Sequence, residues 1–289
     1  MSLATIITQG RVIFVPKEFK LDVSDGLKLQ AYTWEPENKE TVKALVIIVH
    51  GIGEHANCYD EYARYFSFQG ISVFSMDLRG HGRSPGKRGH TAPRANVLKD
   101  IDSLCEIARK TYPKKPLFIY GHSMGGNIGL SHRLYGGVRP RGYIITSPWI
   151  TLYNRIPGIK ILALRAASKI KPDFCIKNGI DSSGITSDKS QVVHGDPLAH
   201  SYISLQTALD CYDLAKKILE TSHEEHGELL LLHSTDDTIC SIEGSRDFMK
   251  HARASCSFIE WEGSRHELQH DKDRETVREV IRDWIVDRI

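Results

Sequence analysis

The sequence lacks the features that mark membrane-spanning, disulfide-stabilised and nucleic-acid-binding proteins. No apolar run approaches the roughly 18 residues that a membrane-spanning helix needs. The six cysteines form no CxxC pair and no closely spaced framework, so we expect reduced thiols. The 38 basic and 36 acidic side chains nearly balance, which predicts no nucleic acid partner. The first ten residues lack a basic, apolar leader, so we expect a cytoplasmic protein.

Internal repeats and low-complexity tracts are also missing from the 289 residues. Short apolar runs alternate instead with segments of helical period, which is typical of a mostly parallel sheet with helices on both faces. We therefore predict a single α/β domain over residues 1–289. The eight predicted strands are 18–23, 27–34, 44–50, 71–77, 116–121, 143–147, 228–234 and 257–263.

Helices are predicted between these strands where apolar residues recur at steps of three and four. The clearest lie near residues 62–70, 97–108 and 277–285. The alternation of strands and helices is interrupted over about 148–204, a long stretch for a connection within a compact domain. We interpret this stretch as a cap inserted over the carboxyl edge of the sheet.

A serine between glycines stands where one apolar run ends and a new pattern begins. Residues 118–130 read FIYGHSMGGNIGL, with Ser123 between Gly121 and Gly125. A strand before a GxSxG motif and a helix after it form the sharp turn that exposes a nucleophilic serine. The glycines permit the close backbone approach that such a turn requires. The sequence predicts Ser123 as a nucleophile, with an ordinary helix N-cap as the alternative.

A serine hydroxyl needs a histidine base and an orienting carboxylate, which follow the serine in the order acid, then histidine, in this kind of fold. Asp236 and Asp237 follow the next-to-last predicted strand, and His266 follows the last one. Parallel neighbouring strands bring these ends to one edge of the sheet. We predict His266 as the base, with His270 as the alternative, and an acid at position 236 or 237.

A glycine-bearing turn after the third predicted strand completes the set of groups that ester hydrolysis requires. Residues 50–55 read HGIGEH. The backbone N–H of Ile52 can point at a substrate oxygen, while the N–H of Met124 supplies a second donor. Gly51 supports this turn. The alternative is that its glycines merely reverse the chain.

Metal-binding patterns do not accompany these residues. The histidines that precede the serine motif show neither an HExxH spacing nor paired cysteines nearby; they are His50, His55, His81 and His90. The HEEH sequence at 223–226 lies in a polar stretch, where solvated side chains are expected. We therefore predict no metal and no organic cofactor.

Five segments together resemble a known family. HGIGEH, DLRGHGRSPGKRGH at 77–90, GHSMGG, HSTDDTIC and EGSRH are similar to the monoglyceride lipase and lysophospholipase branch of the α/β-hydrolase superfamily, over about residues 20–289. The resemblance implies the α/β-hydrolase fold, with a mostly parallel eight-stranded sheet, helices on both faces and an inserted cap.

The same resemblance implies the roles of individual residues. The triad maps to Ser123, Asp237 and His266; Asp237 is chosen because the family's acid stands three residues before a cysteine, here Cys240. The oxyanion donors map to Ile52 and Met124, listed above as candidates. One position departs from the family: many relatives have an arginine where this chain has Cys58, which leaves the head-group preference open.

The predicted cap carries an excess of basic residues. Residues 150–180 hold six basic side chains and one acidic one, whereas the whole chain has a net charge of only +2. A helix is predicted from about Pro157 to Ile170, and its packed face holds Ile159, Leu162, Ala163, Ala166 and Ile170. Ile161 and Leu164 then lie on the polar side and become candidates for peripheral membrane contact. The alternative is a solvated basic face.

These observations predict a serine hydrolase of single-chain acyl lipids, most simply one that cleaves monoacylglycerol to fatty acid and glycerol. Three alternatives remain on the sequence alone. The same triad serves a lysophospholipase, or a short-chain carboxylesterase, thioesterase or perhydrolase, because a fold does not determine its substrate. A non-catalytic binding protein of the same fold is the third.

Overall fold

An eight-stranded sheet forms the centre of the computed structural model, which describes residues 5–8, 11–14, 16–91, 93–187, 196–223 and 227–289. Its spatial order is β12-β11-β8-β7-β5-β6-β4-β3. The strands are β3 (Lys17–Asp22), β4 (Lys28–Trp34), β5 (Ala44–Val49), β6 (Ile71–Met76), β7 (Leu117–His122), β8 (Gly142–Thr146), β11 (Glu228–Ser234) and β12 (Cys256–Trp261). Only β3 and β4 run antiparallel to their neighbours. The predicted fold, with its eight strands, is confirmed.

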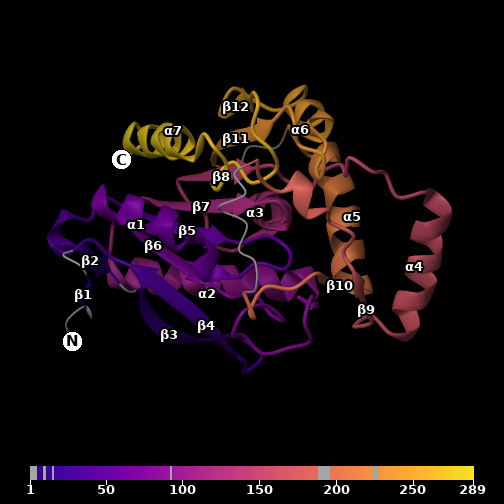
Figure 1. The fold of residues 1–289 in the computed structure, drawn as a ribbon, viewed down its shortest axis with the longest axis horizontal. Helices are drawn as coiled ribbons and strands as arrows, with labels where there is room; N and C mark the ends of the chain where they lie inside the picture. The colour runs from indigo at the N-terminus through magenta and orange to yellow at the C-terminus, as the bar shows by residue number, and fades with distance from the viewer. Residues whose placement is uncertain (1–4, 9–10, 15, 92, 188–195, 224–226) are drawn as a thin grey trace.

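Helices cover both faces of the sheet (Figure 1). They are α1 (Asp60–Phe68), α2 (Arg94–Thr111), α3 (Met124–Tyr135), α4 (Gly158–Ile170), α5 (Leu205–Glu220), α6 (Ile242–Met249) and α7 (Arg274–Val286). Apolar residues of α1 and α7 share one core with one face of the sheet, and those of α2, α3 and α5 share the core on the other face.

The central strand β5 shows why the sheet lies between two cores. All six of its side chains are buried. Val46 and Ile48 point into the core beneath α1 and α7, while Leu45 and Ile47 point into the core beneath α2 and α3. Each such side chain contributes roughly 1.5–3 kcal/mol on burial. A strand that is apolar at every position is therefore stable only with helices on both sides.

The segment between β8 and β11 holds the predicted cap. It contains α4, the short antiparallel pair β9 (Cys175–Lys177) and β10 (Tyr202–Ser204), the turn η3 (Ser182–Gly184), and α5. Residues 188–195 of the predicted cap lie outside the described residues. Helix α4 packs on α5 and stands at the outer end of the molecule (Figure 1).

The predicted orientation of α4 is wrong. Ile161, which was expected to face outward, is 7% exposed, and Leu164 is half-buried. The residues expected to pack are exposed instead: Ile159 at 74%, Leu162 at 64% and Ile170 at 88%. The spacing of apolar residues in the sequence shows only that the two faces of the helix differ in polarity. Because α4 makes a narrow contact with α5 and does not pack on the sheet, the face predicted to be packed points away from the protein. Ile161 is thus excluded as a membrane contact.

One hairpin and two helices were not predicted from the sequence. The N-terminal hairpin consists of β1 (Thr5–Thr8) and β2 (Arg11–Phe14), and it pairs with no other sheet among the described residues. Helices α5 and α6 are the other additions. Helix α5 connects β10 to β11, and α6 connects β11 to β12.

Candidate active site

Ser123 lies in the sharp turn between β7 and α3. Its backbone has φ 55° and ψ −116°, a conformation that a residue with a Cβ adopts only under strain. The turn is held by a hydrogen bond from the Ser123 N–H to the Thr146 carbonyl at 3.1 Å, and Asn127 N–H donates to the Ser123 carbonyl at 3.0 Å. The strained turn lifts the hydroxyl out of the sheet, and Ser123 lines a cavity of about 350 Å³.

The glycines flanking Ser123 allow the chain to approach its neighbours. A Cβ on Gly125 would lie 2.1 Å from the Val49 carbonyl oxygen, which belongs to β5. A Cβ on Gly121 would lie 2.3 Å from the Gly125 carbonyl oxygen. Both contacts are with backbone atoms that cannot rotate away. The GxSxG spacing therefore reflects steric necessity in this turn.

His266 and Asp237 form a buried pair beside the cavity. His266 Nδ1 donates to Asp237 Oδ2 at 2.7 Å. The other carboxylate oxygen, Oδ1, accepts the backbone N–H groups of Ile239 at 2.8 Å and Cys240 at 2.9 Å. His233 Nε2 also contacts Oδ2, at 3.1 Å. Asp237 is thus held in a fixed orientation by four groups, with its charge directed at the His266 ring.

The pKa values of this pair shift in opposite directions. Burial alone would raise the pKa of Asp237, but the charge of His266 and the hydrogen bonds from His233 and His266 lower it well below its ordinary value. Burial would likewise lower the pKa of His266, but the Asp237 carboxylate raises it above its ordinary value. The pair is therefore arranged to stabilise an imidazolium ion next to Ser123.

The HGIGEH turn lies against Ser123. A Cβ on Gly51 would lie 3.4 Å from the Cβ of Ser123, so the turn passes directly beside that side chain. The turn is closed by Glu54 Oε2, which accepts from the Gly51 N–H at 2.7 Å and from the Tyr59 hydroxyl at 2.8 Å. Ile52 follows Gly51 and lines the same cavity as Ser123.

Met124, the second predicted oxyanion donor, is the first residue of α3. Its N–H belongs to the first turn of that helix, where backbone N–H groups have no partner within the helix. The helix dipole favours negative charge at this end. Met124 directly follows Ser123, and Ile52 lies between β5 and the 3₁₀-helix η2 (Ala56–Tyr59), in the turn that passes beside the Ser123 side chain.

One end of the cavity is lined by acidic and imidazole groups. Glu267 Oε2 lies 2.9 Å from His270 Nδ1, and His270 Nε2 donates to the Cys58 carbonyl at 2.9 Å. Glu54 and Cys58 line the same end. No lysine or arginine is found among the described residues that line the cavity.

Burial in this cluster separates the pKa values of its two carboxyl groups. Burial, together with the charge of Glu267, raises the pKa of Glu54 to about 7. Burial would raise the pKa of Glu267 too, but the hydrogen bond and charge of His270 lower it to about 2. Near neutral pH this end of the cavity therefore holds a Glu267–His270 ion pair beside a Glu54 carboxyl that is partly protonated.

The structure separates the alternatives that the sequence left open for the acid and the base. Asp237 is buried against His266, whereas Asp236 is exposed. His270 belongs to the far end of the cavity and pairs with Glu267. Residues 224–226 of the HEEH sequence lie outside the described residues.

Three residues of the site escaped the sequence analysis. His122 lines the cavity and stacks on His266 with ring centroids 4.8 Å apart; burial, followed by the charge of His266, lowers its pKa to about 3. Ser147, at φ 44°, donates from its hydroxyl to the His266 carbonyl at 2.8 Å. His233 contacts Asp237 as described. Their positions at strand ends β7, β8 and β11 were the available signal, since polar residues at such ends gather around an active site.

Comparison with known proteins places this geometry among α/β-hydrolases. A family model described as serine aminopeptidase, S33, matches residues 40–273. An uncharacterized abhydrolase domain-containing protein of Dictyostelium discoideum is 33% identical over 271 residues, which cover 92% of this chain and 28% of that protein. A monoglyceride lipase homolog of monkeypox virus is 30% identical over 252 residues, covering 86% of this chain and 91% of the viral protein.

A solved structure agrees with these relatives. The crystal structure of a soluble variant of monoglyceride lipase from Saccharomyces cerevisiae, in complex with a substrate analog, superposes with a TM-score of 0.84 at 26% identity. The match covers 94% of this chain and 96% of the yeast chain. Within the described part of the chain, no helix is both long enough and apolar enough to span a bilayer.

Proposed function

The chain belongs to the serine aminopeptidase S33 family of α/β-hydrolases and is of the monoglyceride lipase type, and from this premise we propose that it is a serine hydrolase that cleaves monoacylglycerol. The observation that carries the proposal is the 2.7 Å contact between His266 and Asp237 beside the cavity that Ser123 also lines. The three side chains of a nucleophile, a base and an orienting acid come from the ends of β7, β11 and β12.

Acylation begins when the Ser123 hydroxyl attacks the ester carbonyl carbon. His266 takes the hydroxyl proton at Nε2, and Asp237 stabilises the imidazolium through the bond to Nδ1. The carbonyl oxygen gains negative charge, which the backbone N–H groups of Ile52 and Met124 stabilise. When the tetrahedral intermediate collapses, His266 returns the proton to the departing glycerol oxygen and an acyl-serine remains.

Deacylation repeats these steps with water. His266 removes a proton from a water molecule as it attacks the acyl carbon, and the two N–H groups of the oxyanion hole again stabilise the developing charge. Collapse of the second intermediate returns the proton to Ser123 Oγ and releases the fatty acid. The triad chemistry requires neither a metal nor an organic cofactor.

The charge of the cavity favours a neutral head group over a phosphate. The end formed by Glu54, Glu267 and His270 offers carboxyl and imidazole partners for glycerol hydroxyls, and no lysine or arginine accompanies them among the described lining residues. His270 is already paired with Glu267 at 2.9 Å, so its charge is neutralised. A lysophospholipid phosphate would therefore enter this end without a free positive charge to pair with, whereas glycerol needs none. This supports monoacylglycerol over lysophospholipid.

The cap supplies a surface for contact with an anionic lipid membrane. Its exposed apolar stripe consists of Ile159, Leu162 and Ile170, and the basic residues Lys160 and Lys169 lie on the same helix. Apolar side chains enter the lipid interface while each nearby basic residue contributes roughly 1 kcal/mol at an anionic surface. We place the protein in the cytoplasm, in peripheral contact with membranes through this stripe in place of Ile161 and Leu164.

The proposal is tested by fatty acid release from long-chain monoacylglycerol, a matched lysophospholipid and a short-chain ester, with Ser123→Ala as the blank. We expect monoacylglycerol to be preferred and Ser123→Ala to lose on the order of 10⁶ in kcat. A preference for lysophospholipid would overturn the head-group argument. Cleavage of the short ester alone would favour the carboxylesterase alternative, and undiminished turnover by Ser123→Ala would overturn the triad.

A further inference from the structure

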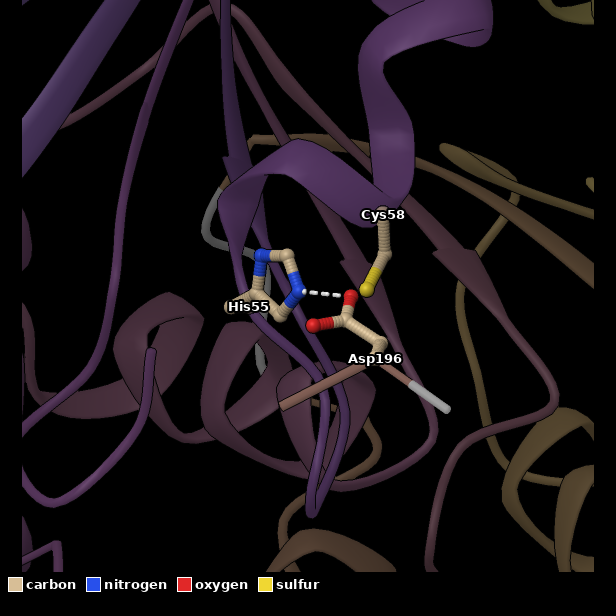
Figure 2. A group of neighbouring side chains, drawn as sticks. All are labelled: His55, Cys58 and Asp196. Carbon is tan, nitrogen blue, oxygen red and sulfur yellow. Dashed lines mark hydrogen bonds and ion pairs between the residues drawn. The ribbon is translucent and has the colours of Figure 1, made fainter. Parts of the chain in front are cut away.

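A histidine, a cysteine and an aspartate meet at the wall of the cavity, apart from the proposed triad. His55 Nε2 lies 2.7 Å from Asp196 Oδ2, and the Cys58 thiol lies beside both (Figure 2). One ligand atom from each of the three side chains falls within 4.8 Å of the other two. We propose that these three residues bind a Zn²⁺ ion, which links the cap to the oxyanion turn.

Local geometry explains how two of the three side chains come together. His55 is the N-cap of the 3₁₀-helix η2, and Cys58 lies three residues later on it. The Cys58 N–H donates to the His55 carbonyl at 3.0 Å, which closes one turn. Side chains three residues apart eclipse one another on a 3₁₀-helix, so the imidazole and the thiol point to the same side.

The third side chain comes from the segment of the cap that precedes β10. Asp196 lies 141 residues from His55 along the chain. The His200 N–H donates to the Gly53 carbonyl at 3.0 Å, and a Cβ on Gly53 would lie 2.0 Å from the His200 carbonyl oxygen. This close backbone contact fixes the cap's returning segment against the HGIGEH turn. The aspartate is therefore delivered by the fold, and no spacing in the sequence could have indicated it.

The donor set suits Zn²⁺ in chemistry and in charge. Thiolate, imidazole and carboxylate are the ligands that zinc takes from proteins, and three protein ligands with one open position are common. Thiolate and carboxylate together balance the charge of the ion. Cys58 also lines the cavity beside Ser123, so an ion held by its thiolate would be reachable from that cavity.

Binding requires a small change of structure and the loss of one proton. Donor atoms around tetrahedral zinc are about 3.3 Å apart, so the 2.7 Å contact between His55 and Asp196 must open by a few tenths of an ångström. Burial and the charges of nearby carboxylates raise the pKa of the Cys58 thiol, so the ion itself must displace the thiol proton to solvent. The His55 ring proton moves from Nε2 to Nδ1, a buried atom for which the described residues provide no hydrogen-bond partner.

A neighbouring cluster is the rival site. Glu54, His122 and Glu267 also place ligand atoms within 4.8 Å of one another. Both carboxylates there already have partners, since Glu54 Oε2 accepts from Gly51 and Tyr59, and Glu267 pairs with His270. The Glu54, His122 and Glu267 cluster also lacks a thiolate, the soft ligand that selects zinc. The cluster around Cys58 is therefore the better site.

Cobalt(II) absorption on the chelator-treated full chain distinguishes the two sites. We expect one equivalent of Co²⁺ to produce a thiolate-to-cobalt charge-transfer band, which one equivalent of Zn²⁺ abolishes. Cys58→Ser is expected to remove the band, and Asp196→Asn to weaken Co²⁺ binding about tenfold or more. Cys175→Ser is the matched control, because that thiol is also half-buried and free. It is expected to keep the band.

Thermal melts without metal verify that each variant folds, and melts with Zn²⁺ provide a second readout. The wild type and Cys175→Ser are expected to gain stability on adding Zn²⁺, whereas Cys58→Ser gains none. A band that survives in Cys58→Ser, or metal binding that is lost only in Glu267→Gln, would overturn the proposal. No binding of Co²⁺ or Zn²⁺ by the folded wild type would overturn it equally. None of these readouts depends on the proposed ester hydrolysis.

Discussion

His266 Nδ1 lies 2.7 Å from Asp237 Oδ2, and this carboxylate receives four hydrogen-bonding groups from β11, the loop after it and the loop after β12. Against the effect of burial, the charge of His266 and the hydrogen bonds from these fixed donors lower the pKa of Asp237 well below its ordinary value, so the carboxylate stays ionised near neutral pH. It therefore acts on the imidazole as a constant negative charge, which raises the pKa of His266.

This contact determines how activity depends on pH. Neutral His266 is required to accept the Ser123 proton, so kcat/KM rises with pH through the His266 pKa and then reaches a plateau. In Asp237→Asn the negative charge is lost, so the pKa of His266 falls and the acid limb of the profile moves to lower pH. The plateau is expected to fall on the order of 10⁴, by analogy with other serine triads.

The measurement is a pH–rate profile of the wild type and Asp237→Asn with a soluble short ester. Asp236→Asn, at the exposed neighbouring position, is the matched control and is expected to keep both the profile and the plateau. An acid limb that stays in place in Asp237→Asn, or moves to higher pH, would contradict the assigned pair.

The glycine after Ser123 predicts a steric effect on stability and activity. Gly125→Ala places a methyl group 2.1 Å from the Val49 carbonyl oxygen, which can be relieved only by moving β5 or α3. Overpacking of this kind destabilises by roughly 1–3 kcal/mol. Because the shift also moves the HGIGEH turn relative to Ser123, activity is expected to fall further than stability explains.

Gly158→Ala is the control for this change. It begins α4, its φ is not positive, and an added Cβ finds no atom within 4 Å. This substitution is expected to leave activity intact and to raise stability by a few tenths of a kcal/mol, since alanine loses less backbone entropy. Denaturant melts and initial rates measure stability and activity for both variants. Equal stability and activity of Gly125→Ala and Gly158→Ala would refute the steric argument.

The sequence predicted the sheet more accurately than the cap for a physical reason. The runs 44–49 and 229–232 are apolar at every position, and a run of that kind is stable only in the middle of a covered sheet. The stripe on 157–170 carries less information. It shows that one helix face differs from the other but not whether protein, water or lipid lies against it.

Contacts between residues that are far apart in the sequence were the part of the site that could not be predicted. The GxSxG motif, His266 and an acid at position 236 or 237 could be identified because topology brings strand ends together, and the family resemblance then selected Asp237. The Glu54–Glu267–His270 cluster could not. His270 contacts the Cys58 carbonyl across 212 residues of sequence, and nothing local to either segment indicates that contact.

The exposed stripe of α4 predicts a selective loss of membrane binding. Replacing Ile159, Leu162 and Ile170 together by serine removes three exposed apolar side chains from the cap. Binding to vesicles that contain anionic lipid is expected to weaken about tenfold or more, while turnover of a dissolved short ester stays unchanged. Sedimentation with vesicles and ester assays measure the two effects.

Two control variants separate membrane contact from damage to the fold. Val286→Ser changes an exposed apolar residue on α7, far from α4 in Figure 1, and is expected to bind vesicles as the wild type does. Ile161→Ser changes the buried residue of α4 and is expected to lower the melting temperature. Equal vesicle binding by the wild type and the triple variant would exclude the stripe as a membrane surface.

The acidic end of the cavity predicts a change of head-group preference. Glu267→Gln keeps the size of the side chain but removes the negative charge that neutralises His270. A lysophosphatidate, whose phosphate can then pair with His270, is expected to gain about tenfold in kcat/KM relative to monoacylglycerol, equivalent to about 1.4 kcal/mol. Monoacylglycerol, which carries no charge, is expected to change little in KM.

The ratio of the two kcat/KM values in one preparation measures the effect and is insensitive to the fraction of active enzyme. Glu18→Gln, at an exposed position on the edge strand β3 and paired with Arg83, is the matched charge control. An unchanged ratio in Glu267→Gln would mean that the charge balance at this end does not select the head group, and selectivity would then have to arise from the shape of the cap.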